Sequence, residues 1–174
     1  MLPAGVAAGT PRDLGLRIAH DGSWHYLGSP IKRIELVRLF ASVLRREQDG
    51  SYWLVTPVER GLIEVEDAPF VAVELEVEKR GRRRDQRLRL RTNLDQWVTI
   101  DEAHRLRLGK PAGPIAETSG PVPYVLVRDG LDARLARSVY YQLVEFGEED
   151  RHDGVVRFGV WSAGCFFPLD DAQA

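Results

Sequence analysis

The sequence lacks the features that mark several large classes of protein. Cys165 is the only cysteine among the 174 residues, so no disulfide can form within the chain, as is usual for proteins of a reducing compartment. No apolar run approaches the ~18 residues that a membrane-spanning helix needs. The formal net charge of −2 provides no general attraction to nucleic acid or to an anionic membrane. We therefore expect a cytoplasmic protein that does not enter a membrane.

Motifs of catalysis and metal binding are also missing. The run Asp101-Glu102-Ala103-His104 has the letters of a helicase box, but no phosphate-binding G-x-x-x-x-G-K-[ST] loop accompanies it. Ser162 lies outside any G-x-S-x-G nucleophile pattern. The four histidines are scattered, without partners at metal-ligand spacing. The sequence therefore predicts no catalytic residue, no metal site and no cofactor.

What the sequence does contain is a helix–turn–strand pattern that occurs twice. In the first copy, Ser29 can cap a helix and Pro30 suits the first helical position. Apolar residues then recur at three- and four-residue spacing, at Val37, Phe40 and Leu44. This pattern predicts a helix over residues 30–46 and a strand over 52–56.

A weaker copy of the pattern lies near the C-terminus. Its apolar stripe consists of Val139, Leu143 and Phe146, and Gly147 can end the helix. We expect a helix over residues 132–146, followed by strands over 155–161 and 165–169. An Asp-Gly pair precedes each copy, which supports an internal repeat.

Two hairpins can be aligned residue by residue. In the first, a three-residue loop pairs Ile18 with Trp24 and Leu16 with Tyr26, which puts four apolar side chains on one face. In the second, pairing Val77 with Leu88 aligns a ladder of opposite charges, namely Glu78 with Arg87, Glu76 with Arg89 and Glu74 with Arg91. Exposed pairs of this kind are worth only ~0–1 kcal/mol each, so the ladder sets the register more than it adds stability.

Few helices and many short strands with hairpin-length links predict an α+β fold with antiparallel sheets. We expect two small units, each with one main helix, related as a repeated strand–helix–strand–strand motif. Asp67-Ala68-Pro69 marks the boundary between them. The expected organisation is a disordered N-terminus (1–12), an N-terminal unit (13–69), a C-terminal unit with the long charged hairpin (70–169) and a tail (170–174).

Arginine, asparagine and tryptophan side chains gather where the expected strands end. Arginine suits carboxylates and phosphates, and tryptophan suits binding surfaces. We therefore expect a ligand-binding cleft between the two units, lined by Arg91, Asn93, Trp97, Arg128 and Trp161. For any one of these residues, an ordinary salt bridge or packing over the core is the competing interpretation.

Several stretches together resemble a known family. They are Arg17–Trp24, Leu36–Phe40 with Val43–Glu47, Leu54–Glu59, Val65–Phe70, Arg91–Asn93 with Trp97-Val98, Arg137–Tyr141, and Gly159–Gly164 with Phe166–Pro168. In these the chain resembles the bacterial domain of unknown function family 1285, over residues 13–169. The resemblance implies a two-part α+β fold with a repeated motif, and a role in bacterial signalling or regulation. It supplies no catalytic residues.

Three functional hypotheses follow. The first is a non-catalytic binding or regulatory module, which takes a small anionic ligand or a protein partner in the cleft. The second is an enzyme acting on a phosphorylated or carboxylated small molecule, with Asp67 or Glu59 as acid or base. The third is nucleic-acid binding through the basic tip, residues 79–84. We do not favour the third, because the tip contains no aromatic residue on which bases could stack.

Overall fold

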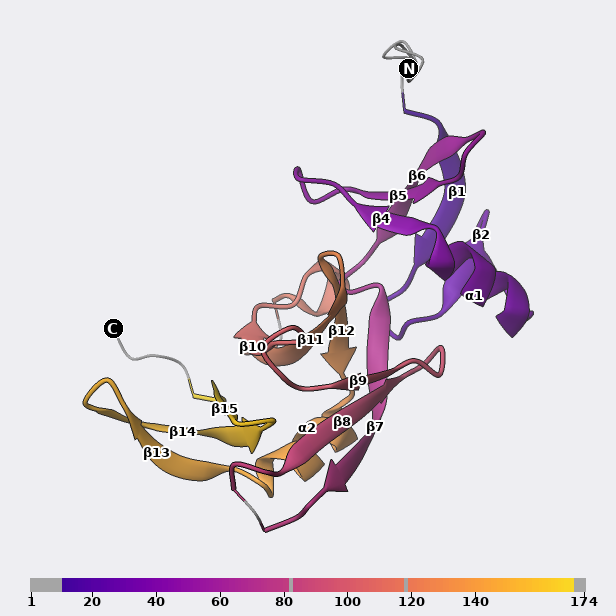
Figure 1. Cartoon of the computed structure of the whole chain (residues 1–174). Helices are drawn as coiled ribbons and strands as arrows, with labels where there is room; N and C mark the ends of the chain where they lie inside the picture. Colours follow the sequence, from indigo (N-terminus) through magenta and orange to yellow (C-terminus); the bar gives the residue numbers. More distant parts are fainter. Residues whose placement is uncertain (1–10, 82, 118, 171–174) are drawn as a thin grey trace, which may run out of the picture.

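The computed structural model describes residues 11–81, 83–117 and 119–170. In these ranges the chain is mainly β, with two six-stranded sheets and one three-stranded sheet (Figure 1). The expected α+β class, with one main helix in each of two units, is therefore wrong. The two α-helices have only nine and eight residues. The expected disordered segment 1–12 and tail 170–174 fall almost entirely outside the described residues.

The first sheet uses residues 13–65. Its strands are β1 (Asp13–Ile18), β2 (Trp24–Tyr26), β3 (Ser29–Pro30), β4 (Leu44–Arg46), β5 (Tyr52–Val55) and β6 (Arg60–Val65). Helix α1 (Ile34–Ser42) lies between β3 and β4 in the chain. It packs against the sheet through the buried Val37 and Ala41 and through a stacked contact between Phe40 and Trp24.

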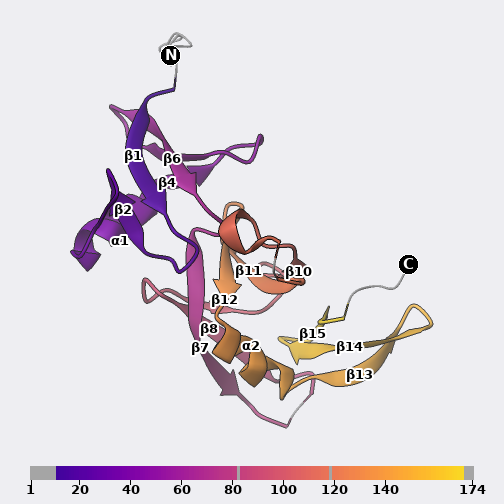
Figure 2. The same cartoon turned by 180° about the vertical axis from the view of Figure 1, so that it is seen from behind.

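The second sheet uses residues 70–135, and a third sheet follows it. The second sheet contains β7 (Phe70–Glu78), β8 (Arg87–Thr92), β9 (Trp97–Thr99), β10 (Leu106–Gly109), β11 (Val122–Arg128) and β12 (Leu131–Leu135), with a 3₁₀ turn η1 (Gly113–Ile115). After α2 (Arg137–Val144), the third sheet consists of β13 (Glu148–His152), β14 (Val155–Ser162) and β15 (Cys165–Pro168). The first and third sheets lie at opposite ends of the molecule, with the second between them (Figures 1 and 2).

The two six-stranded sheets have the same strand order. Each consists of two three-stranded antiparallel meanders, joined at the centre by parallel pairing of the first strand with the last, β1 with β6 and β7 with β12. The helices are not part of this common order, because α1 interrupts the first sheet whereas α2 follows the second. The expected repeat, in which a helix is the shared element, is therefore wrong.

Both hairpin registers are confirmed. Ile18 pairs with Trp24 and Leu16 with Tyr26, and Val77 pairs with Leu88. The charged residues of the second hairpin face one another as expected, and Arg89 and Arg91 form ion pairs with glutamates of β7. The opposite face of the hairpin is apolar, and Leu88 and Leu90 are fully buried.

The helix expected over residues 30–46 is shorter at both ends. Ser29 and Pro30 form the edge strand β3, paired with Tyr26 and His25, and an edge strand tolerates proline because one of its sides needs no donor. The cap position is Arg33, which makes no side-chain cap hydrogen bond. Residues 44–46 form β4, because they pair with β5. The strand expected over 52–56 is observed as β5.

The first four residues of the helix expected over residues 132–146 belong to a strand. Leu131, Ala133 and Leu135 alternate with polar residues and are buried, which is the period of a strand. Residues 131–135 pair with β11 on one side and with β7 on the other, so α2 starts only at Arg137. The strands expected over 155–161 and 165–169 are observed as β14 and β15.

Candidate functional site

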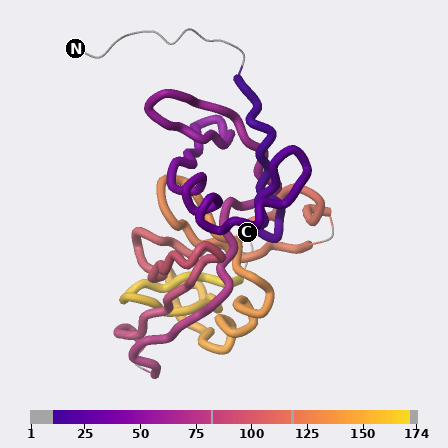
Figure 3. The backbone as a smooth tube through the Cα atoms, turned by 90° about the vertical axis from the view of Figure 1, so that its right-hand side faces the viewer, coloured from indigo at the N-terminus to yellow at the C-terminus, as the bar shows by residue number. Residues whose placement is uncertain are grey.

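The units formed by the first and second sheets meet along a boundary that side-chain hydrogen bonds cross. Figure 3 shows the N-terminal part of the chain, in indigo and purple, stacked on the later part. Asn93, in the turn after β8, accepts a hydrogen bond from the backbone N–H of Val71 (3.0 Å) and donates one to the carbonyl of Gly22 (3.2 Å). The bond to Gly22 crosses the boundary, and the bond to Val71 fixes the Asn93 side chain against β7 of its own unit.

Asp67 lies at the covalent join between the units and is only 3% exposed. Its Oδ1 accepts hydrogen bonds from the Tyr124 hydroxyl and the Ala112 N–H, both at 2.8 Å, and its Oδ2 lies 3.4 Å from Nε of Arg134. Burial and the hydrogen bond to Asp67 raise the pKa of Tyr124. Arg134 in turn donates to the carbonyl of His20. These contacts hold the boundary together and leave Asp67 no open space for a substrate.

A line of charges continues the boundary. Arg91 binds Glu74 and Asp95 at 2.6 and 2.7 Å, and Asp95 also pairs with Arg38 of α1. Trp97 is the cross-strand neighbour of Arg91. The guanidinium of Arg89, rather than that of Arg91, lies over the Trp97 ring, 5.1 Å from its centroid. Arg91 and Trp97 are therefore next to the boundary but not on the cavity described next.

A cavity of about 480 Å³ lies between the two units. The N-terminal unit lines it with the end of α1 and the start of β4, and the C-terminal unit lines it with the turns that follow β8 and β11. Its walls are Arg38, Ala41, Ser42, Arg45, Phe70, Leu94, Gln96, Arg128 and Asp129. Three arginines and one acid, Asp129, therefore line one small space. Of the three arginines, Arg38 is already paired with Asp95, outside the lining.

Arg45 and Arg128 are held by backbone carbonyls at the C-terminal end of α1. Arg128 donates to the carbonyl of Ala41, and Arg45 donates to those of Leu44 (2.8 Å) and Ser42 (3.4 Å). Within the part of the chain that the structure describes, neither has a carboxylate within 4.0 Å. Burial and the neighbouring charge of Arg45 lower the pKa of Arg128. An anion between the two guanidinium groups would relieve their repulsion.

The comparisons with known families cover almost the whole chain. Residues 9–68 match the domain of unknown function DUF1285, N-terminal domain, and residues 69–169 match the protein of unknown function DUF1285, C-terminal domain. The chain belongs to the DUF1285 family. The resemblance drawn from the sequence is thereby confirmed. No curated protein matches this DUF1285 chain.

Two solved structures of the DUF1285 family resemble this fold. One, from Silicibacter pomeroyi DSS-3, is 44% identical, with a TM-score of 0.79, and the match covers 96% of this chain and 87% of that one. The other, from Shewanella baltica OS155, is 28% identical, with a TM-score of 0.56, and the match covers 75% of this chain and 91% of that one. Both are described only by family, so neither supplies an activity.

Trp161 lies away from the other four residues expected in the cleft. It belongs to β14, where its Nε1 donates to Asp150 (3.0 Å) and the guanidinium groups of Arg83 and Arg84 lie 5.5 and 5.7 Å from the centroid of its ring. The described residues that line the inter-unit cavity include none from the third sheet. Of the five expected residues, Arg128 is on the cavity, Arg91, Asn93 and Trp97 are beside it, and Trp161 is remote.

The basic tip contacts the body of the protein. Arg83 pairs with Glu148 and, at 2.6 Å, with Asp150, and Arg80 lies over the Phe146 ring. Arg82 is outside the described residues. Within the described part of the tip, the charge of Arg83 is therefore matched by acids of β13 in the same chain.

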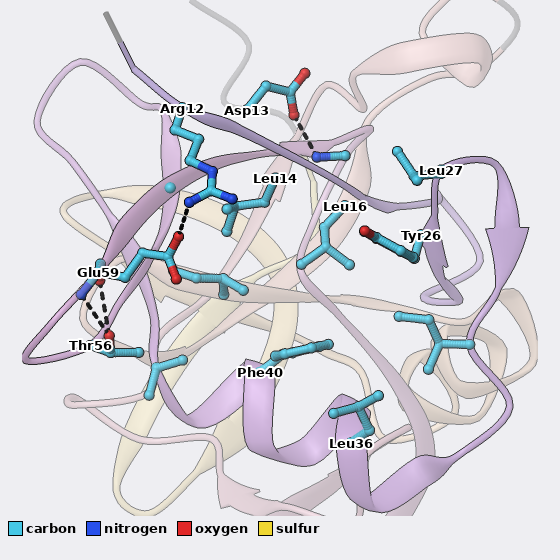
Figure 4. Close-up of a pocket in the computed structure, with 15 residues that line it drawn as sticks. Arg12, Asp13, Leu14, Leu16, Tyr26, Leu27, Leu36, Phe40, Thr56 and Glu59 are labelled. Atoms are coloured by element: carbon cyan, nitrogen blue, oxygen red, sulfur yellow. Dashed lines mark hydrogen bonds and ion pairs between the residues drawn. The ribbon is translucent and has the colours of Figure 1, made fainter. Parts of the chain in front are cut away.

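A second and larger cavity, of about 760 Å³, lies inside the N-terminal unit of this DUF1285 protein. Figure 4 shows Leu14 and Leu16 on one side and Leu36 and Phe40 of α1 on the other. Glu59, the second acid of the enzyme hypothesis, lies at one end and pairs with Arg12 at 2.6 Å. The apolar spacing of α1 indicated only a face packed on a sheet, so this cavity was not expected.

Two further features concern the described residues as a whole. They contain no group of three or more histidine, cysteine, aspartate or glutamate side chains arranged to hold a metal ion. None of their helices has the length and apolar character needed to cross a membrane.

Proposed function

We propose that this DUF1285 protein is a non-catalytic binding module that takes a small anionic ligand in the cavity between its two units. The observation that carries the proposal is the convergence of Arg38, Arg45 and Arg128 on that cavity. A guanidinium has five N–H donors, and the carbonyls of α1 use only part of those of Arg45 and Arg128. The donors that remain suit the oxygens of a carboxylate or phosphate.

The same contacts also have a structural explanation. Positive side chains stabilise the C-terminal end of a helix, where carbonyls lack partners, and this accounts for one role of Arg45 and Arg128. It does not require two arginines to meet there without a carboxylate partner. We therefore favour an anion as the partner of Arg45 and Arg128. The same site would supply the regulatory role, because an anion bound by residues of both units would stabilise one arrangement of the units.

A titration of anions at constant ionic strength tests the proposal. Pyrophosphate and citrate supply the phosphate and carboxylate groups, and sodium chloride supplies the reference. We expect one of the two to raise the melting temperature and to bind with a dissociation constant below 1 mM by calorimetry, about −4 kcal/mol or better. Equal shifts in all three salts would show only general screening and would refute a specific site.

Matched arginine substitutions locate the binding. Arg45→Gln removes one exposed cation from the cavity, and we expect at least a fivefold loss of affinity. Arg105→Gln removes an exposed arginine that does not line the cavity, and we expect no change. Equal losses in the two variants would mean that the protein responds to overall charge and not to this site.

A further inference from the structure

We propose that the ligand of the inter-unit cavity is a small anion that also carries an ammonium group, and that Asp129 binds the ammonium. This inference rests on the proposed function and names the class of ligand for the same site. Three features of the cavity carry it. They are the unmatched charges of its lining, the position of Asp129 beside Arg128, and the neutral groups that complete the walls.

The lining of the cavity has charges of both signs that lack an ionic partner. Of its arginines, Arg38 pairs with Asp95, whereas Arg45 and Arg128 are bound to backbone carbonyls. The carboxylate of Asp129 makes no ion pair or hydrogen bond with any residue that the structure describes. Two positive charges and one negative charge therefore remain for a ligand to match. A dianion that also bears an ammonium group matches all three.

The carboxylate of Asp129 acts on the guanidinium of Arg128 through space. Its negative charge opposes the lowering of the pKa of Arg128 that burial and the charge of Arg45 cause. Although the two groups are this close, no direct bond joins them in the described part of the chain. The acid and the arginines thus border one space without neutralising one another. A ligand that carries both signs of charge would contact each of them.

The turn that contains Asp129 does not account for its charge. Asp129, with a φ of 41°, and Gly130, with a φ of 75°, form the two-residue turn between β11 and β12. Such turns favour Asn-Gly as much as Asp-Gly, so a neutral asparagine would serve the backbone equally well. Asp153 and Gly154 form the corresponding turn between β13 and β14, outside the cavity lining. That turn provides a matched reference.

The neutral groups of the cavity suit the remainder of such a ligand. The side-chain amide of Gln96, which has no hydrogen-bond partner among the described residues, can donate to an anionic oxygen or accept from an ammonium group. Phe70 and the half-buried Leu94 provide an apolar surface for a few methylene groups. The volume of about 480 Å³ lies within the ~300–1,000 Å³ of small-molecule sites. The cavity therefore has room for a ligand with two charged ends.

Two pairs of ligands, in which the members differ only in the ammonium group, test the inference. Glutamate is compared with glutarate, and 2-aminoethyl phosphate with ethyl phosphate, by calorimetry at pH 7 and constant ionic strength. We expect the ammonium-bearing member of at least one pair to bind at least fivefold more tightly, because Asp129 attracts the ammonium and repels the plain anion. That pair also identifies the anionic group as carboxylate or phosphate. If neither ammonium-bearing member binds more tightly than its counterpart, the inference is wrong.

Asp129→Asn connects this preference to the named residue. The variant keeps the turn and removes the charge, so its melting temperature should not fall. We expect at least a fivefold loss of affinity for the ammonium-bearing ligand and at least a twofold gain for the matched plain anion. Asp153→Asn is the control, and both affinities should be unchanged in it. If Asp129→Asn raises both affinities, or if the two variants behave alike, Asp129 does not bind an ammonium group and the inference falls.

The proposed function and this inference fail in different ways. If pyrophosphate or citrate binds and Arg45→Gln weakens it, but none of the four matched ligands binds, the anion site stands and the ammonium preference is wrong. If none of the six ligands binds, the proposed function is wrong, and the inference falls with it.

Discussion

The guanidinium of Arg128, at the end of β11, donates a hydrogen bond across the unit boundary to the carbonyl of Ala41, in the last turn of α1. This contact ties the second sheet to the helix of the first. It also holds Arg128 beside Arg45, so the same bond that joins the units creates the positive cavity. Stability of the boundary and affinity for an anion are therefore coupled at one residue.

Arg128→Met should weaken the boundary. The variant removes a charged hydrogen bond from a half-buried site, and bonds of this kind contribute about 1.5–3 kcal/mol. We expect a loss of that size in the free energy of unfolding, measured with urea, and a further loss of anion affinity. Arg105→Met, at an exposed position, should change the unfolding free energy by less than about 0.5 kcal/mol. If Arg105→Met lowers the unfolding free energy as much as Arg128→Met does, the effect of Arg128→Met cannot be assigned to the unit boundary.

Asn93→Leu should destabilise the protein by about 1–3 kcal/mol. The leucine has a similar size but leaves the Val71 N–H and the Gly22 carbonyl without their partner, and an unsatisfied backbone group costs about this much. Hydrogen exchange at Val71 is the direct measurement, because its amide loses protection. Full protection in the variant would contradict the assigned hydrogen bond.

Ser162→Ala should act on stability alone. Ser162 is fully buried. Its hydroxyl donates a hydrogen bond to the Ile100 carbonyl (2.5 Å) and accepts one from the Leu88 N–H (3.0 Å). These two bonds join β14 to the second sheet. We expect a loss of about 1–3 kcal/mol in thermal or urea unfolding. Ser138→Ala on the exposed side of α2 is the control and should be nearly neutral. Equal effects would mean that the buried bonds contribute little.

The protein should lose stability in acid as Glu66 becomes protonated. The N–H of His20, together with Arg17, lowers the pKa of Glu66 below its usual value. A lowered pKa means that the stabilisation is present above the unfolded-state pKa and is lost as the pH falls through the folded-state pKa. Urea unfolding at pH 7 and in steps below pH 4.5 should show this loss. In Glu66→Gln the free energy of unfolding should fall less steeply with decreasing pH over that range. An unchanged slope would assign the acid sensitivity to other carboxylates.

The candidate site was only partly visible in the sequence. Arg128 could be chosen because it precedes an Asp-Gly turn, and it lies on the cavity. The sequence pattern places Arg45 in the last turn of a helix over residues 30–46, because nothing local shows that residues 44–46 pair with β5. Trp161 was chosen, like the other candidates, because it is a polar or aromatic residue at the end of an expected strand. Its strand, however, belongs to the third sheet. Residue type and position along the chain do not distinguish residues on the inter-unit cavity from residues remote from it.

The sequence by itself determined the local pairings. Alternation with a period of two and the facing charges of Glu76 and Arg89 set the hairpin registers, because a slip of one residue would turn every apolar side chain to the wrong face. Only the tertiary structure decided the fold class and both cavities. The parallel pairs join segments that are far apart in the chain: Ile18 pairs with Val65, and Phe70 pairs with Ala133. Such contacts leave no periodic signal along the chain, and they made residues 131–135 a strand instead of the start of a helix.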